Sequence, residues 1–86
     1  MLNAMTDEEY MQLALQEARA ADVIGEIPIG AVLVVEGEVV AKAHNMRETW
    51  NDATAHAEVI VIREACKKLG RWRFLCLFLF RFLLMQ

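Results

Sequence analysis

Near the start of the chain, apolar residues recur at the three- and four-residue spacing of one helix face. They are Met11, Ala14, Leu15, Ala18 and Ala21. Thr6 and Glu9 have the spacing of a capping box, which satisfies free N–H groups at a helix start, and Gly25 suits a helix end. The pattern therefore predicts an amphipathic helix over residues 7–24, and Met5, just before it, is the expected initiator.

Two short apolar runs follow this helix. The first, IGAVLVV at residues 29–35, is rich in β-branched residues, and the second, EVVAKAH, occupies residues 38–44. A short glycine-containing link between two such runs is typical of a β-hairpin. The first run is apolar without alternation, so we expect its strand to be covered on both faces, as in a layered α/β domain.

A polar loop then separates the hairpin from a second helix. The loop, NMRETWNDAT at residues 45–54, contains several turn formers, and Asp52 or Thr54 is the expected N-cap of the second helix. Helical spacing then predicts a helix over about residues 55–69 that ends at Gly70. Its apolar positions are Val59, Ile62, Ala65, Cys66 and Leu69.

The composition changes abruptly after Arg73. Residues 74–86, FLCLFLFRFLLMQ, contain all four phenylalanines of the chain and a single charge, Arg81. A membrane-spanning helix needs ~20 apolar residues, so this tail is too short to span. Two interpretations stay open, namely a buried third strand, or a frame-shifted or truncated segment that does not belong to the domain.

Length and charge limit the class of protein. A chain of 86 residues allows one small domain, and its net charge of −3 provides no global attraction to nucleic acid. Two cysteines without metal-like spacing, and no recognisable signal peptide, favour reduced thiols and a cytoplasmic location. One local patch could contact RNA, or could simply complement the end of the second helix. It comprises Lys67, Lys68, Arg71, Trp72 and Arg73.

Four motifs occur in order along residues 6–73: PIGAV at 28–32, AHNMRE at 43–48, AHAE at 55–58 and GRWR at 70–73. Together they resemble the bacterial tRNA adenosine deaminases, which belong to the cytidine-deaminase-like zinc hydrolases. The resemblance implies the α/β/α layers of that fold, of which the chain contains the N-terminal half. It also implies zinc-dependent hydrolysis of adenosine to inosine at the tRNA wobble position, with the anticodon loop as partner, and a homodimer.

The resemblance also assigns roles to individual residues. His56 is the implied zinc ligand, and Glu58 is the catalytic carboxylate that moves protons without binding metal. Asn45 is the implied hydrogen-bond partner of the target base, and the N–H of Ala57 faces the activated water or the substrate. The implied walls of the base pocket are Ile27, Pro28 and Ile29.

Elementary chemistry agrees with these residue types. Zinc can lower the pKa of its bound water to about 7, and a carboxylate can carry the released proton to the departing amine. Residues two apart on a helix do not share a face, so the spacing of His56 and Glu58 suits one ligand and one proton carrier rather than two ligands.

The chain departs from the family pattern after residue 73. The family continues with P-C-x-x-C, which supplies two cysteine ligands, but the sole proline here is Pro28 and no such motif exists. Catalytic zinc normally has three protein ligands, so we expect this chain alone neither to hold catalytic zinc nor to deaminate. Residues 1–73 are then the N-terminal part of a deaminase domain, and residues 74–86 are an apolar tail.

Two other functions stay open on the sequence alone. One is a guanine or cytosine deaminase of the same superfamily, which the motif around residues 51–59 would also suit. The other is a non-catalytic fragment that pairs with intact subunits.

Overall fold

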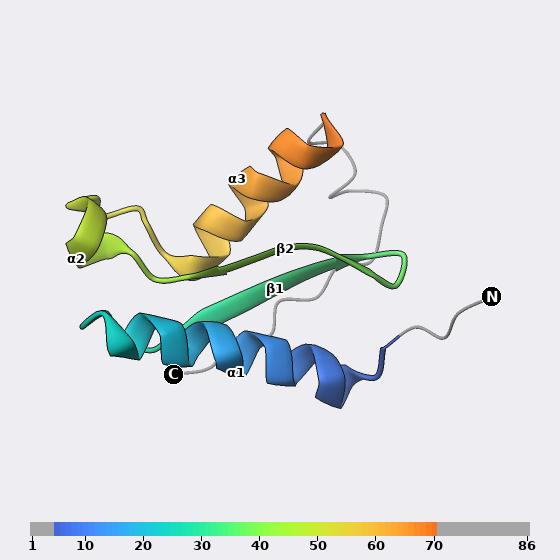
Figure 1. Ribbon diagram of the computed structural model, residues 1–86. Helices are drawn as coiled ribbons and strands as arrows, with labels where there is room; N and C mark the ends of the chain where they lie inside the picture. The colour runs from blue at the N-terminus through green and yellow to red at the C-terminus, as the bar shows by residue number, and fades with distance from the viewer. Residues whose placement is uncertain (1–4, 71–86) are drawn as a thin grey trace.

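The computed structural model describes residues 5–70. These residues form three helices and a two-stranded sheet, in the order helix, hairpin, short helix, helix (Figure 1). Residues 71–86 lie outside the described residues, and with them the apolar tail, in either of its two interpretations, and Arg71, Trp72 and Arg73. The elements are α1 (Asp7–Val23), β1 (Gly30–Val35), β2 (Glu38–His44), α2 (Arg47–Trp50) and α3 (Ala57–Leu69).

The capping box at the start of α1 forms as the sequence predicts. The N–H of Glu9 donates to Thr6 Oγ1 at 3.2 Å, and the N–H of Thr6 donates to Glu9 Oε1 at 2.7 Å. Gly25 follows the last turn with a φ of +84°, a conformation that a side chain disfavours. Both ends of α1 are therefore determined by residues close in sequence.

β1 and β2 form the predicted antiparallel hairpin. Their register pairs Gly30 with His44, and an irregularity lies between Leu33 and Val34. Glu36 and Gly37 both have positive φ, as a tight two-residue hairpin turn requires.

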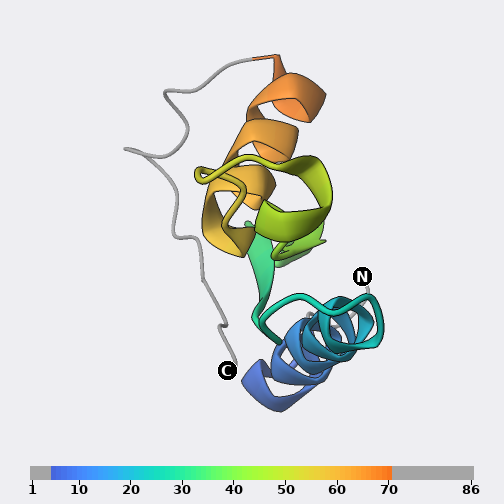
Figure 2. The ribbon, with the colours of Figure 1, turned by 90° about the vertical axis from the view of Figure 1, so that its left-hand side faces the viewer.

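The sheet lies between helices, with α1 on one face and α3 on the other (Figure 2). Val32 and Val34 pack with Tyr10 of α1, while Leu33 packs with Val61 of α3. All six residues of β1 are buried. The prediction of a strand covered on both faces, in an α/β layered fold, is confirmed.

Gly30 lets α1 approach the sheet closely. A Cβ atom at this position would lie 2.1 Å from the carbonyl oxygen of Ala14 and 2.6 Å from the nitrogen of Ala18. Both are backbone atoms and cannot turn aside. Any side chain here would therefore separate the helix from β1.

Two local predictions were wrong. The loop expected over residues 45–54 contains the four-residue helix α2, and the second long helix begins at Ala57 with His56 as its N-cap, not with Asp52 or Thr54. Asp52 instead accepts hydrogen bonds from the N–H and hydroxyl of Thr54, which makes a local turn before α3.

Among residues 5–70, no helix combines the length and apolar character needed to cross a bilayer.

Candidate active site

Asn45 lies directly after β2 and joins three segments of the chain. Its N–H donates to the carbonyl oxygen of Ile29 at 3.1 Å, and its side-chain Oδ1 accepts from the N–H of Ala57 at 2.8 Å. The residue is 1% exposed, so these are buried contacts. The structure thus brings together Ile29, Asn45 and Ala57, all of which sequence reasoning assigned to the substrate site.

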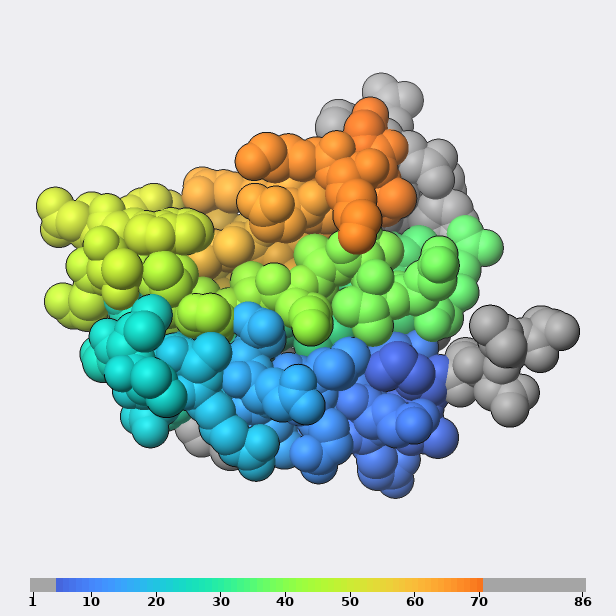
Figure 3. Space-filling view, viewed as in Figure 1, coloured from blue at the N-terminus to red at the C-terminus, as the bar shows by residue number. Residues whose placement is uncertain are grey.

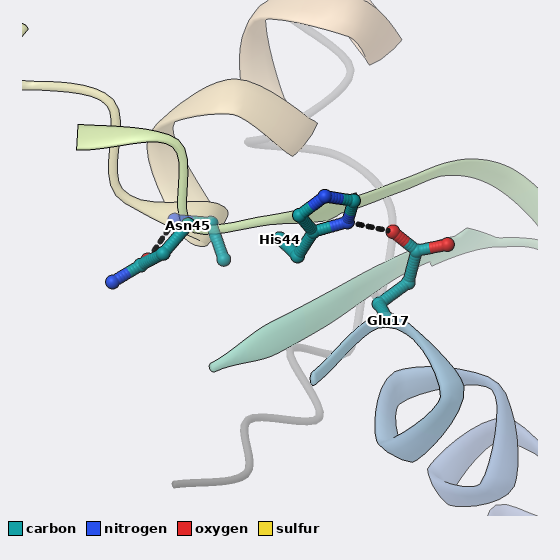
Figure 4. Close-up of polar contacts among 4 residues, drawn as sticks. Glu17, His44 and Asn45 are labelled. Carbon is teal, nitrogen blue, oxygen red and sulfur yellow. Dashed lines mark hydrogen bonds and ion pairs between the residues drawn. The ribbon is translucent and has the colours of Figure 1, made fainter. Parts of the chain in front are cut away.

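The side-chain amide of Asn45 has one end occupied and one end available. Oδ1 is taken by Ala57, whereas within residues 5–70 no hydrogen bond engages Nδ2. Figure 4 shows this amide nitrogen pointing away from the pair formed by His44 and Glu17. The Ala57 N–H, which the family resemblance directs at water or substrate, is engaged with Asn45 in the structure.

His56 and Glu58 flank Ala57 at the beginning of α3. His56 is the N-cap residue, with extended backbone, and its side chain makes no capping hydrogen bond. Both side chains are partly buried. Glu58 lies in the first helical turn, where the helix dipole favours a negative charge. The residue that bonds to Asn45 is therefore preceded by an imidazole and followed by a carboxylate in the chain.

The loop between α1 and β1 contributes the residues expected to form the base pocket. Pro28 sits in a tight turn closed by a 2.8 Å hydrogen bond from the N–H of Ile29 to the carbonyl oxygen of Ile27. Ile27 is half exposed, and Pro28 and Ile29 are partly buried. Since Ile29 is bonded to Asn45, this turn borders the candidate site.

Glu26 is a buried carboxylate that sequence reasoning missed. It is 5% exposed, and its oxygens accept from the N–H of Glu48 at 3.2 Å, and from the N–H and hydroxyl of Thr49, each at 2.6 Å. The hydroxyl of Thr49, followed by the two N–H groups, lowers the pKa of Glu26, although burial opposes the shift. Between a helix stop and a strand, a lone glutamate gives no pattern signal that would distinguish it from a surface residue.

Two further polar contacts lie near the site. Nδ1 of His44 is 2.7 Å from Glu17 Oε1, which ties the end of β2 to α1 (Figure 4). Hydrogen bonds from Thr54 lower the pKa of Asp52 and shape the turn that precedes His56.

Residues 4–81 match the model of the cytidine and deoxycytidylate deaminase zinc-binding region. The chain belongs to this family. It is 60% identical over 67 residues to a tRNA-specific adenosine deaminase of Bacillus subtilis, a match that covers 78% of this chain and 42% of that protein. The chain therefore spans less than half the length of this curated relative.

Solved structures of deaminases share the fold. One, from a study of A-to-I editing by tRNA:A34 deaminases at the wobble position, is 53% identical with a TM-score of 0.73, over 74% of this chain and 49% of that one. Another is a guanine deaminase from Bacillus subtilis, 43% identical with a TM-score of 0.73, over 78% and 43%. The cytidine-deaminase-like fold predicted from sequence is confirmed.

The family region is named for zinc, but the donor set in the described part of this chain does not fit a zinc site. Within residues 5–70, no three His, Cys, Asp or Glu side chains lie together as potential ligands. His56 is near Glu58 in sequence. The free thiol of Cys66 belongs to a residue ten positions after His56, which is about 15 Å along α3 at the rise of a helix. A catalytic site needs three protein ligands, and one imidazole does not provide them.

The basic patch of this chain is distant in sequence from the site. Lys67 and Lys68 lie in the last turn of α3, where cations complement the helix dipole. Lys67 is 3.6 Å from Glu64, and Lys68 donates to the carbonyl oxygen of Val40 at 3.3 Å. A shallow pocket of about 410 Å³ lies beside them on β2, and none of the predicted site residues lines it.

Proposed function

We propose that this chain forms the first part of a deaminase that converts adenosine to inosine at the wobble position of tRNA. The similarity to tRNA-specific adenosine deaminases supports the substrate. The observation that carries the proposal is the buried contact between Asn45 and Ala57, the residue that lies between His56 and Glu58 in the chain.

Each residue has a definite task in this proposal. Asn45 Nδ2, the free end of the amide, donates to an acceptor on the base, and Ala57 holds that amide in orientation through Oδ1. The turn at Pro28, with Ile29, forms an apolar wall for the base. In the reaction, a water oxygen bonds to the ring carbon and the amino group leaves as ammonia. Glu58 takes the proton from the water and delivers it to the departing nitrogen.

The metal that the family uses needs ligands beyond the described residues. We propose His56 as the one zinc ligand that residues 5–70 provide. The 86-residue chain alone should therefore contain well under one tightly bound zinc per molecule and show no turnover. Elemental analysis of the purified chain, together with an inosine assay, tests this expectation. One zinc per chain accompanied by deamination would contradict it.

RNA binding tests the substrate without requiring turnover. We expect the chain to bind an anticodon stem–loop with adenosine at the wobble position more tightly than the same stem–loop with guanosine. Asn45→Asp is the matched variant, because aspartate keeps an oxygen for the Ala57 N–H and loses the NH₂ donor. It should remove the preference for adenosine. Equal binding of both RNAs by the unmodified chain would contradict the proposal.

A second candidate function has a specific observation in its favour. The guanine deaminase of Bacillus subtilis matches the fold as well as the tRNA deaminase structure does, at lower identity. A change in the NMR chemical shifts of Asn45 on adding free guanine, with no change on adding the stem–loop, would favour this alternative. Titrating the same labelled chain with each ligand in turn distinguishes the two outcomes.

The remaining family properties are proposals of the same kind. We propose that the complete protein acts in the cytoplasm as a homodimer, and that this chain can pair with intact subunits of its relatives. Co-purification with a full-length homologue, without activity of the chain itself, would support the pairing.

A further inference from the structure

We propose that Glu26 is a positioning residue for the candidate active site, because its carboxylate fastens the loop before β1 to helix α2 and so sets the positions of Ile29, Asn45 and Ala57. The assignment of these three residues to substrate rests on the proposed function. The fastening itself rests on hydrogen bonds within residues 5–70 alone.

Helix α2 has no cap of its own. Its N-cap residue, Met46, makes no side-chain hydrogen bond, and a four-residue helix contributes little stability by itself. The N–H groups of Glu48 and Thr49, which a local cap would satisfy, both point to Glu26 instead. One carboxylate that lies 22 residues earlier in the chain therefore holds this helix in place.

The position of α2 is transmitted to the site through the backbone. Met46, between Asn45 and α2, donates its N–H to the carbonyl oxygen of Ala55 at 3.0 Å. Asp52 donates its N–H to the carbonyl oxygen of Arg47, also at 3.0 Å. Both ends of the segment that leads into α3 are thus bonded to α2 or its N-cap.

The other side of the fastening is equally short. Two residues separate Glu26 from Ile29, whose carbonyl oxygen accepts a hydrogen bond from the N–H of Asn45. The N–H of Glu26 itself donates to the carbonyl oxygen of Ala21 at 2.9 Å, which anchors it to the end of α1. Figure 3 shows the α2 region (yellow-green) resting on the end of α1 and the loop that follows it (cyan).

The hydrogen bonding of Glu26 is that of a buried carboxylate that holds α2 in place, not that of a solvated surface charge. The carboxylate accepts three hydrogen bonds, two of them from N–H groups, and charge-assisted bonds of this kind are stronger than neutral ones. A glutamine amide would offer only one oxygen and would turn an NH₂ group towards another donor. Glu26→Gln is therefore a substitution of nearly equal size that breaks the fastening.

Glu9 provides a matched control. It also accepts a backbone N–H, from Thr6, but it is exposed and the contact spans three residues at the far end of α1. Glu9→Gln removes the same carboxylate charge without touching the site.

The test uses the ¹⁵N-labelled full chain and follows the N–H of Ala57 and the side-chain NH₂ of Asn45. We expect Glu26→Gln to shift both resonances and to raise hydrogen exchange at Ala57 roughly tenfold, the effect of losing one charge-assisted bond. Glu9→Gln should change neither. Thr49→Val, which removes only the hydroxyl donor, should have a smaller effect, and Thr49→Ser should restore the normal values.

A Glu26→Gln chain in which only the amides of Glu48 and Thr49 change would overturn the proposal, since the fastening would then not reach the site. If this variant does not fold, Thr49→Val decides in the same way: unchanged signals at Ala57 and Asn45 would overturn it. Failure of the unmodified chain to bind the adenosine stem–loop would refute the proposed function alone, because the exchange measurement needs no RNA.

Discussion

The start of α1 and the starts of α2 and α3 are stabilised in different ways. α1 is capped by Thr6 and Glu9, residues at its own first turn. α2 and α3 have no side-chain cap at their N-cap positions. Their first N–H groups instead donate to side-chain oxygens of Glu26 and Asn45, which lie 22 and 12 residues earlier in the chain. A local cap stabilises a helix without fixing its position relative to other elements. A distant cap also fixes the position of the helix relative to the segment that supplies the cap. The distant caps are found at the candidate active site.

The largest effect is expected where α1 meets the sheet, because Gly30 lies directly against the backbone of α1. Glu26, the distant cap of α2, is also hydrogen-bonded to the end of α1. Gly30→Val would push side-chain atoms into the backbone of Ala14 and Ala18. We expect a loss of about 4 kcal/mol or more in the free energy of unfolding, enough to unfold a small domain. Urea denaturation followed by circular dichroism measures it.

Gly25→Ala is the comparison for this prediction. Gly25 has a positive φ of 84°, and a methyl group at this position would meet no atom within 4 Å, so only the backbone conformation opposes the change. The expected loss is about 1 kcal/mol. Equal losses for the two glycines would contradict the close approach at Gly30.

Removing a distant cap should cost more than removing a local one. Asn45→Ala leaves the N–H of Ala57 without its acceptor in a buried place. An unsatisfied buried donor costs about 1–3 kcal/mol, and urea denaturation should show a loss of this size. Asn45→Asp keeps the acceptor and should lose less. A loss below about 0.5 kcal/mol for Asn45→Ala would show that α3 does not depend on this contact.

Acid should release the other distant cap. The pKa of Glu26 is lowered in the folded protein, chiefly by the hydroxyl of Thr49, then by the N–H groups of Thr49 and Glu48, with His44 contributing charge. In the window below roughly pH 4.3, the ordinary glutamate pKa, the unfolded chain therefore binds more protons, and stability falls as pH falls. The pKa of Asp52 is also lowered, by its hydrogen bonds from Thr54, so this carboxylate makes stability fall with pH in the same direction. Asp52→Asn is therefore the control.

Thermal unfolding between about pH 6 and pH 3 brackets this window and tests the expectation. Glu26→Gln should be less stable at the upper end of the range and should show a shallower decline towards acid than the unmodified chain. Asp52→Asn measures the part of the acid dependence that comes from Asp52 rather than from Glu26. An identical acid slope in the Glu26→Gln chain would show that this carboxylate is not held in its charged form by the fold.

The local cap should have a moderate effect. Thr6→Ala removes the acceptor for the N–H of Glu9 at an exposed helix start, where water can replace it. Loss of such a cap costs about 1 kcal/mol. Hydrogen exchange should increase in the first turn of α1 and stay unchanged at Ala57. An increase at Ala57 as well would mean that local and distant caps are not independent.

The smallest effect belongs to an ion pair on the surface. Lys67 and Glu64 are 3.6 Å apart, with side chains 76% and 54% exposed. Exposed pairs of this kind contribute about 0–1 kcal/mol, so Lys67→Ala should change stability by less than about 0.5 kcal/mol. A loss above about 1 kcal/mol in urea denaturation would contradict this ranking.

Local pattern predicted most of the fold. The spacing of apolar residues located α1, both strands and α3 to within two residues, because helices and strands bury their residues with different periods. The capping box and the glycine stop of α1 were predicted for the same reason: their partners are sequence neighbours. The start of α3 was misplaced, since Asp52 and Thr54 bond to each other rather than to the helix.

The candidate site was only partly accessible to sequence reasoning. Asn45, His56, Ala57 and Glu58 came from a family resemblance carried by four short motifs, and the structure places Asn45 against Ala57. The role of Glu26 could not be predicted from local sequence pattern, because its hydrogen-bond partners are 22 and 23 residues away.

The sequence by itself determined the order of elements, the doubly covered strand and the family of this chain, and it determined that P-C-x-x-C is missing. Only the tertiary structure decided that Glu26 caps α2, that Asn45 caps α3, and that Gly30 touches the backbone of α1. The physical reason is the range of the interactions. Periodicity and local caps involve residues a few positions apart, whereas a buried polar group finds its partner wherever the packed layers place one.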